Sequence, residues 1–132
     1  MINIKELSVG NWIQNINGNS GRVIGITEHG EVIMRYEDNS TCYSELNMLR
    51  PIPVTEKILK NSGFGYIEKD KYITHFYPGE PQICTDMDLH IGTDNKGIFW
   101  INDLTNDYEY FQYVHQLQNI FTLWNIKIEI QL

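Results

Sequence analysis

The sequence predicts an α+β protein built from two lobes, and three observations lead to this expectation. Four short apolar segments between residues 11 and 44 are separated by turn-forming residues at intervals of about 8–12 residues. A short helical segment with clear signals at both ends follows them. The remaining residues combine a second set of alternating segments with one longer helical pattern. At 132 residues and 42% hydrophobic content, the chain has the size and composition of a globular protein.

The N-terminal lobe is expected to be a small antiparallel β structure. Its predicted strands are NWIQNI, RVIGIT, EVIMRY and TCYS. The clusters between them, such as Asn17-Gly18 and Glu28-His29-Gly30, are typical of tight turns because glycine adopts positive φ without strain. Gly10 and Gly25 are candidate bends of a curled sheet. We therefore predict a small SH3-like barrel over residues 1–53.

A connector and one short helix follow this lobe. Arg50-Pro51-Ile52-Pro53 is expected to be extended, since proline fixes φ and disfavours a helical residue before it. Thr55 is the predicted N-cap of a helix from Glu56 to Ser62, and Gly63 is its predicted C′ residue. Residues 54–132 are predicted to form an α+β lobe that packs on the first lobe as one compact unit.

A second antiparallel sheet is expected between residues 66 and 101. Its candidate strands are KYITHFY, QICTDMDLHI and GIFWI, the last two joined by a hairpin loop over 94–97. The second of these alternates: Met87, Leu89 and Ile91 share one face, and Asp86, Asp88 and His90 share the other. Successive residues on one face of a strand are about 7 Å apart, so the acidic face is interpreted as solvated rather than as a metal site.

The C-terminal part is predicted to contain a long helix and a final strand. Asn106 and Glu109 are spaced like a capping box at the start of this helix. Its core-facing stripe is expected to hold Tyr110, Tyr113, Val114, Leu117, Ile120, Phe121 and Trp124. The last seven residues, IKIEIQL, alternate between apolar and polar side chains and are predicted to form a half-buried strand.

The predicted long helix has no charged residue between Tyr110 and Asn125. The favoured interpretation is that its amides are hydrogen-bonded inside the protein, as buried polar groups must be. The alternative is a docking surface, because interface centres are poor in charge. Its candidate residues are Phe111, His115, Gln118, Asn119 and Leu123, with Asp86, Asp88 and Asp94 of the acidic sheet face as a second region.

Charge and motifs limit the functional classes. The net charge is −7, and residues 72–132 hold eight acidic side chains against Lys96 and Lys127. This charge disfavours direct nucleic-acid binding and favours a partner with a basic surface. No metal-binding or nucleophile motif is present, so we expect no cofactor, no metal and no catalytic residues. With neither a signal peptide nor a membrane span in the sequence, and with Cys42 and Cys84 expected as free thiols, we predict a cytoplasmic protein.

Three short motifs resemble a family of small uncharacterised proteins from bacteroidete genomes, prophages and mobile elements. They are Gly10-Asn11-Trp12, the stretch from Pro51 to Glu56, and the group His115, Leu117, Gln118 and Asn119. The resemblance covers both ends of the chain but not residues 66–104. It implies an accessory protein that acts in the bacterial cytoplasm, where such proteins frequently bind and block a host protein.

The leading functional hypothesis is therefore a non-enzymatic protein that binds another protein, with a homodimer as an alternative to a foreign partner. A second hypothesis is a small-molecule or metal-dependent enzyme with a pocket between the lobes, lined by His115, Gln118 and an acidic residue. A third is a purely structural homo-oligomer with a symmetric interface centred on Phe111 and Leu123.

Overall fold

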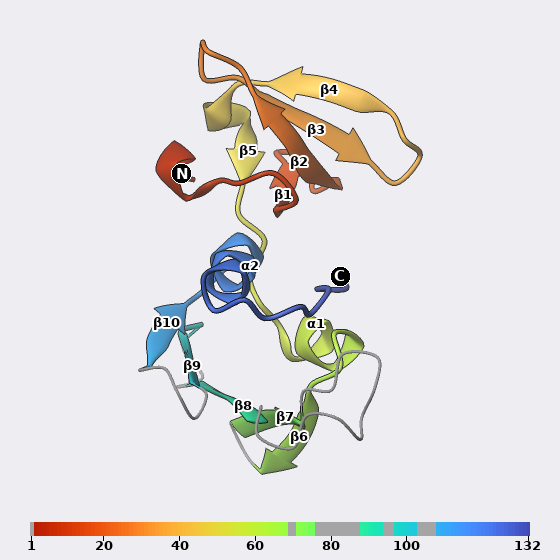
Figure 1. The fold of residues 1–132 in the computed structure, drawn as a ribbon. Coiled ribbons are helices and arrows are strands. Elements are labelled where there is room, and N and C mark those ends of the chain that lie inside the picture. Colours follow the sequence, from red (N-terminus) through yellow and green to blue (C-terminus); the bar gives the residue numbers. More distant parts are fainter. Residues whose placement is uncertain (1, 69–70, 76–87, 94–96, 103–107) are drawn as a thin grey trace. The chain divides into compact units, whose positions relative to one another are not determined.

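The computed structural model describes residues 2–68, 71–75, 88–93, 97–102 and 108–132 (Figure 1). The chain is α+β, as predicted, and divides into two compact units. The first unit contains Met1–Ile52 and Tyr113–Asn119, and the second contains Pro53–Gln112 and Ile120–Leu132. The division after Ile52 lies one residue from the predicted boundary, but the return of residues 113–119 to the first unit was not predicted. Within the described ranges, no helix combines the length and the apolar character needed to cross a membrane.

The first unit contains a five-stranded antiparallel sheet in the order β4-β3-β2-β1-β5 (Figure 1). All four predicted strands form, and a fifth short strand returns to pair with the first. Two 3₁₀ turns accompany them, one before β1 and one between β4 and β5. The bounds are η1 (Ile4–Glu6), β1 (Trp12–Asn15), β2 (Ser20–Ile26), β3 (Val32–Tyr36), β4 (Thr41–Ser44), η2 (Leu46–Met48) and β5 (Leu49–Arg50).

Alternation along these strands separates an inner from an outer face. The inner positions are fully buried, and they pack with two residues that precede the sheet into one apolar core. This core consists of Ile2, Leu7, Ile13, Val23, Val32, Met34 and Leu49. Since side chains alternate along a strand, the residues between these positions point outward.

The short helix α1 (Glu56–Asn61) confirms the prediction from its end signals. The Thr55 hydroxyl accepts a hydrogen bond from the Ile58 amide at 3.2 Å. At the other end Gly63 has φ +97°, and the Phe64 amide donates to the Leu59 carbonyl. This pair of features is the Schellman motif, in which a residue with positive φ ends the helix.

The second unit contains another five-stranded antiparallel sheet, in the order β10-β9-β8-β7-β6. Its strands are β6 (Gly65–Glu68), β7 (Lys71–His75), β8 (Asp88–Thr93), β9 (Phe99–Asn102) and β10 (Glu109–Phe111). Leu89 and Ile91 are buried, as the alternation of β8 predicts. The first part of the predicted strand, residues 82–87, and the hairpin residues 94–96 lie outside the described ranges.

The long C-terminal helix starts later than predicted. Helix α2 spans Val114–Leu123, and Glu109 to Phe111 form β10 instead of its first turns. Tyr110 pairs with Trp100 of β9 and is 68% exposed, so it is not a core residue of the helix. The capping side chain is Gln116, which accepts a hydrogen bond from the Tyr113 amide at 3.2 Å. The predicted capping box of Asn106 and Glu109 therefore does not start this helix, because Glu109 belongs to β10; Asn106 itself lies outside the described residues.

The predicted final strand is also wrong. Residues 126–132 have no strand partner among the described residues, although Ile126 and Ile130 are buried. Helix α2 ends in a second Schellman motif, with Asn125 at φ 57° and the Ile126 amide donating to the Phe121 carbonyl. The chain then runs back along α1, where the Gln131 amide donates to the Ser62 hydroxyl at 2.9 Å.

Candidate functional site

The uncharged face of α2 is hydrogen-bonded to the start of the first sheet. Both atoms of the Gln118 amide are used: its Oε1 accepts from the Trp12 amide at 2.8 Å, and its Nε2 donates to the Gly10 carbonyl at 3.1 Å. One side chain thus pairs with two backbone groups, in the way that a neighbouring strand would. Those backbone groups flank Asn11, just before and at the start of β1.

Asn119 makes the second half of this contact. Its Oδ1 accepts from the Asn11 side chain at 3.1 Å, and its Nδ2 donates to the Glu6 carbonyl. Asn11 is only 3% exposed, and its own Oδ1 accepts from the Ser8 amide at 2.8 Å. We call these bonds of Gln118 and Asn119 with residues 6–12 the amide contact. It lies wholly within the first unit.

His115 is buried beside the amide contact, with 1% of its surface exposed. Its Nε2 lies 3.2 Å from a carboxylate oxygen of Glu6, and the Tyr113 ring stacks against the imidazole. Burial lowers the pKa of His115, and the hydrogen bond and charge of Glu6 oppose this shift only in part. A neutral ring donates through Nε2–H, which leaves Nδ1 as an acceptor, and Nδ1 has no hydrogen-bond partner in the described structure.

These contacts explain why α2 carries no charge, in agreement with the favoured interpretation of the sequence. They also correct the predicted docking set. Phe111 lies in β10, is 2% exposed and stacks on Phe99, so it presents no surface on a helix. His115 is likewise buried. Leu123, at 77% exposure, is the member of the helical set that is open to solvent.

The acidic region of the predicted set is only partly visible. Asp86 and Asp94 lie outside the described residues, and Asp88 is placed at the start of β8 by its backbone. Docking through these three carboxylates stays a prediction.

A different surface stands out on the outer face of the first sheet. Trp12 of β1 lies directly opposite Arg22 of β2, and Arg22 lies directly opposite Arg35 of β3. The Arg22 guanidinium sits over the Trp12 ring, 4.6 Å from its centroid. We call this row of three side chains the arginine row.

The arginine row lines a hollow of about 200 Å³. Ile24 supplies an apolar wall, and Tyr36, Glu37 and Asn39 come from the end of β3 and the turn after it. The Tyr36 hydroxyl is held at 3.2 Å from both Asn15 and Cys42. Hydrogen bonding to Cys42 and burial together raise the pKa of Tyr36, so its hydroxyl is neutral at physiological pH.

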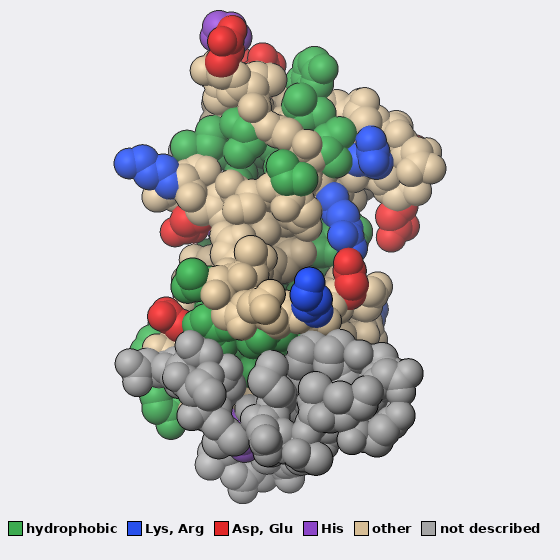
Figure 2. Space-filling view, viewed as in Figure 1, with side chains coloured by type: hydrophobic (Ala, Val, Ile, Leu, Met, Phe, Trp, Pro, Cys, Tyr) green, Lys and Arg blue, Asp and Glu red, His purple; other side chains and the backbone are tan. Residues whose placement is uncertain are grey.

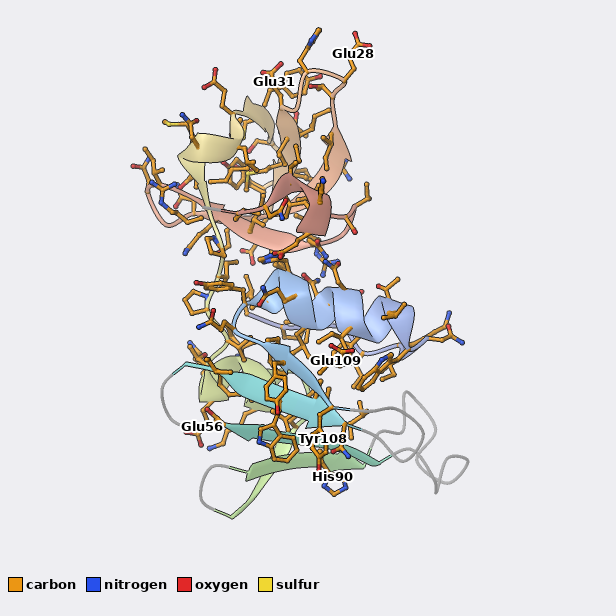
Figure 3. The ribbon with its side chains drawn as sticks, turned by 90° about the vertical axis from the view of Figure 1, so that its left-hand side faces the viewer. Glu28, Glu31, Glu56, His90, Tyr108 and Glu109 are labelled. Atoms are coloured by element: carbon orange, nitrogen blue, oxygen red, sulfur yellow. The ribbon has the colours of Figure 1, made fainter. Side chains whose placement is uncertain are left out.

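The charge around this hollow differs from that of the whole chain. Two guanidinium groups face one carboxylate, that of Glu37, among the lining residues. Glu28 and Glu31 lie at the turn between β2 and β3, at the far end of the two strands from Arg22 and Arg35 (Figure 3). Figure 2 shows hydrophobic, basic and acidic side chains interspersed on the visible face of this unit. The positive charge of the row is therefore local.

A second, wider depression of about 590 Å³ lies at the β2–β3 turn and η2. Its ionisable side chains are His29, Glu31 and Glu45, and its lining residues include no Phe, Tyr or Trp. Among the residues whose placement is described, no three His, Cys, Asp or Glu side chains are grouped so that they could hold a metal ion. This depression therefore offers less specific chemistry than the arginine row.

Comparison of the chain with protein-family models, with curated proteins and with solved structures finds no match. The site must therefore be judged from its own geometry. The sequence reasoning missed the arginine row, although alternation carried a signal for it: Arg22 precedes the buried Val23, and Arg35 follows the buried Met34. Both positions are outward by that rule.

Proposed function

We propose that this protein is a non-enzymatic binding module whose partner is another protein, and that the outer face of the first sheet contacts that partner. The observation that carries the proposal is the arginine row with its hollow. Trp, Tyr and Arg are the residue types that contribute most to protein interfaces. Tyr43 and Ile33 lie opposite each other on the same outer face, and Tyr43 is 68% exposed.

An SH3-like fold for the first unit belongs to this proposal. Strands β1 to β4 form a meander, and β5 returns to pair with β1 after the 3₁₀ turn η2. This is the order expected of a small SH3-like barrel, a fold that commonly presents aromatic side chains to peptide segments. The order supports the assignment that the spacing of the turns predicts.

The biological setting is proposed from the resemblance alone. The motifs at Gly10-Asn11-Trp12, Pro51 to Glu56 and His115 to Asn119 support an accessory protein of a phage or mobile element in the bacterial cytoplasm. In that setting the partner is a host protein, and binding blocks its activity.

Capture experiments with matched variants test whether the outer face of the first sheet contacts the partner. The purified protein is immobilised, bound proteins are identified from a bacterial lysate, and the capture is repeated with Tyr43→Ser and Leu123→Ser. Both residues are large, apolar and exposed, but they lie on β4 and α2 respectively. We expect Tyr43→Ser to reduce the recovery of a specific partner about tenfold, as loss of an interface aromatic does.

Leu123→Ser serves both as the control and as the test of docking on α2. If Tyr43→Ser recovers as much partner as the unmodified protein while Leu123→Ser recovers less, the partner binds α2 and not the outer face of the sheet. Equal recovery with all three proteins refutes both surfaces.

A further inference from the structure

We infer that the hollow of the arginine row binds a carboxylate side chain from an extended segment of the partner, flanked by apolar residues. This inference rests on the proposed function, since it names the chemistry that the sheet face recognises. It starts from the register of the sheet, which places two arginines directly opposite each other beside a hollow that Glu37 also lines.

Arg22 and Arg35 occupy directly opposite positions on adjacent antiparallel strands. Like charges in this arrangement repel each other, so the pair costs stability unless an anion lies between them. Arg35 is exposed, and its side chain forms no ion pair with any residue that the structure describes. Arg35 is therefore open to the carboxylate of a partner, and the guanidinium of Arg22 adds its positive charge beside it.

The Trp12 ring restricts the conformation of the Arg22 side chain. The contact between this ring and the Arg22 guanidinium, 4.6 Å from the centroid, limits the rotamers of Arg22 before any partner arrives. A guanidinium that is held in this way loses less side-chain entropy on binding, and its planar fork matches the two oxygens of a carboxylate. Arg22 is thus a preorganised half of the site, and Arg35 is the adaptable half.

Two lining residues select against other anions. The hollow has room for a side chain, at about 200 Å³, and Ile24 offers an apolar wall beside Trp12. The Glu37 carboxylate, which also lines the hollow, repels a second negative charge. A single carboxylate between apolar side chains fits this arrangement better than a phosphate chain, in which every unit is charged. We therefore assign the hollow to a protein segment and not to a nucleic acid.

The test uses the whole chain and three labelled probes in fluorescence anisotropy. The first probe is the amidated peptide fluorescein-Gly-Leu-Glu-Leu-Ser-Gly, whose peptide part carries one carboxylate. The second replaces its Glu by Gln, and the third is a labelled oligothymidylate of six nucleotides. We expect the Glu peptide to bind at least fivefold more tightly than the Gln peptide, and more tightly than the oligonucleotide. We also expect this binding to weaken as NaCl rises from 50 to 500 mM.

Variants assign the binding to the hollow. We expect Arg35→Gln to weaken the Glu peptide about tenfold, and Arg35→Lys to restore only part of the loss because ammonium lacks the fork. Lys5→Gln removes the same charge from an exposed position that does not line the hollow, and we expect it to change binding less than twofold. Since Arg35 is exposed, these substitutions leave the core intact.

Three results overturn the inference. They are equal binding of the Glu and Gln peptides, tighter binding of the oligonucleotide, and equal weakening by Arg35→Gln and Lys5→Gln. If the Glu peptide binds no more tightly than the Gln peptide while Tyr43→Ser still abolishes partner capture, the carboxylate site is wrong and the protein-binding function stands. If Arg35→Gln weakens peptide binding but Tyr43→Ser leaves recovery of the partner unchanged, the carboxylate site stands and the proposed interface is wrong.

Discussion

Replacing Gln118 by Met removes the centre of the amide contact and keeps most of the volume of the side chain. In the folded protein, Gln118 accepts from the Trp12 amide at 2.8 Å and donates to the Gly10 carbonyl at 3.1 Å. Met offers neither group. The variant therefore leaves one backbone donor and one backbone acceptor without their partner, in a partly buried place where water reaches them poorly.

The size of the effect follows from those two bonds. Leaving a buried polar group without its partner costs about 1–3 kcal/mol, and partial exposure favours the lower end. Two such groups give a loss of about 2 kcal/mol in the free energy of unfolding. For a chain of this size, 1 kcal/mol corresponds to roughly 3–5 °C, so the unfolding temperature should fall by about 8 °C.

The assay is urea unfolding followed by circular dichroism, with Gln131→Met as the matched control. The Gln131 side chain is exposed, and its backbone amide, which the substitution keeps, donates to the Ser62 hydroxyl, so the control should stay within about 0.5 kcal/mol of the unmodified protein. Gln118→Glu keeps the acceptor but sets a carboxylate against the Gly10 carbonyl. It should be unstable at pH 7 and recover partly below about pH 4–5, where a protonated Glu donates again. A loss below 0.5 kcal/mol for Gln118→Met would show that the amide contact does not stabilise the fold.

Three further predictions concern other parts of the chain. Burial lowers the pKa of His115 in the folded protein, so the unfolded chain binds a proton at His115 more readily; the stability from this residue is full above about pH 6.5 and falls as the pH drops through the lower pKa of the folded protein. Urea midpoints at pH 7.5 and 5.5 should show that His115→Gln removes part of this pH dependence. Gly92→Ala would set a methyl group against the Trp100 ring, so the ring must move, at a cost of about 1–3 kcal/mol and with a changed near-ultraviolet circular dichroism spectrum. An unchanged spectrum would contradict the close packing. Thr55→Ala should lower the free energy of unfolding by about 1 kcal/mol through loss of the helix cap, and Thr55→Ser should retain it; equal stability of the two variants would rule out the cap.

The sequence predicts those elements whose signals are local. Thr55 and Gly63 mark both ends of α1, and the turn clusters separate the four strands of the first sheet. In each case the residue that ends the element also makes the bond or adopts the φ angle that ends it. Such signals need no knowledge of distant residues.

The errors occur where two patterns fit the same residues. Tyr110 and Phe111 fit a helical stripe, but pairing with Trp100 and Phe99 of β9 makes them a strand. This choice depends on a neighbouring strand, which helical periodicity does not reveal. The last seven residues alternate without a fault, yet a strand also needs a hydrogen-bonded partner. The alternation in this segment reflects the burial of Ile126 and Ile130 and not the pairing of a strand.

The arginine row was not predicted from the sequence for a related reason. Alternation turns Arg22 and Arg35 outward, but only the register of three strands sets them in line with Trp12. The partners of the amide contact are even more remote: 108 positions separate Asn11 from Asn119. The sequence indicated that the amides of α2 need partners, and it held no signal for which residues supply them.

The amide contact has a consequence for the order of events during synthesis. The backbone groups at residues 6–12 leave the ribosome early, whereas Gln118 and Asn119 follow them by 106 to 113 positions. At about 5–20 residues per second, the roughly 60 residues between β5 and α2 take several seconds to translate. During this interval all five strands of the first sheet have been synthesised, while the Gly10 carbonyl and the Trp12 amide still lack Gln118. A premature stop after β5 but before residue 118 therefore yields a chain whose first sheet has every strand and still lacks this contact.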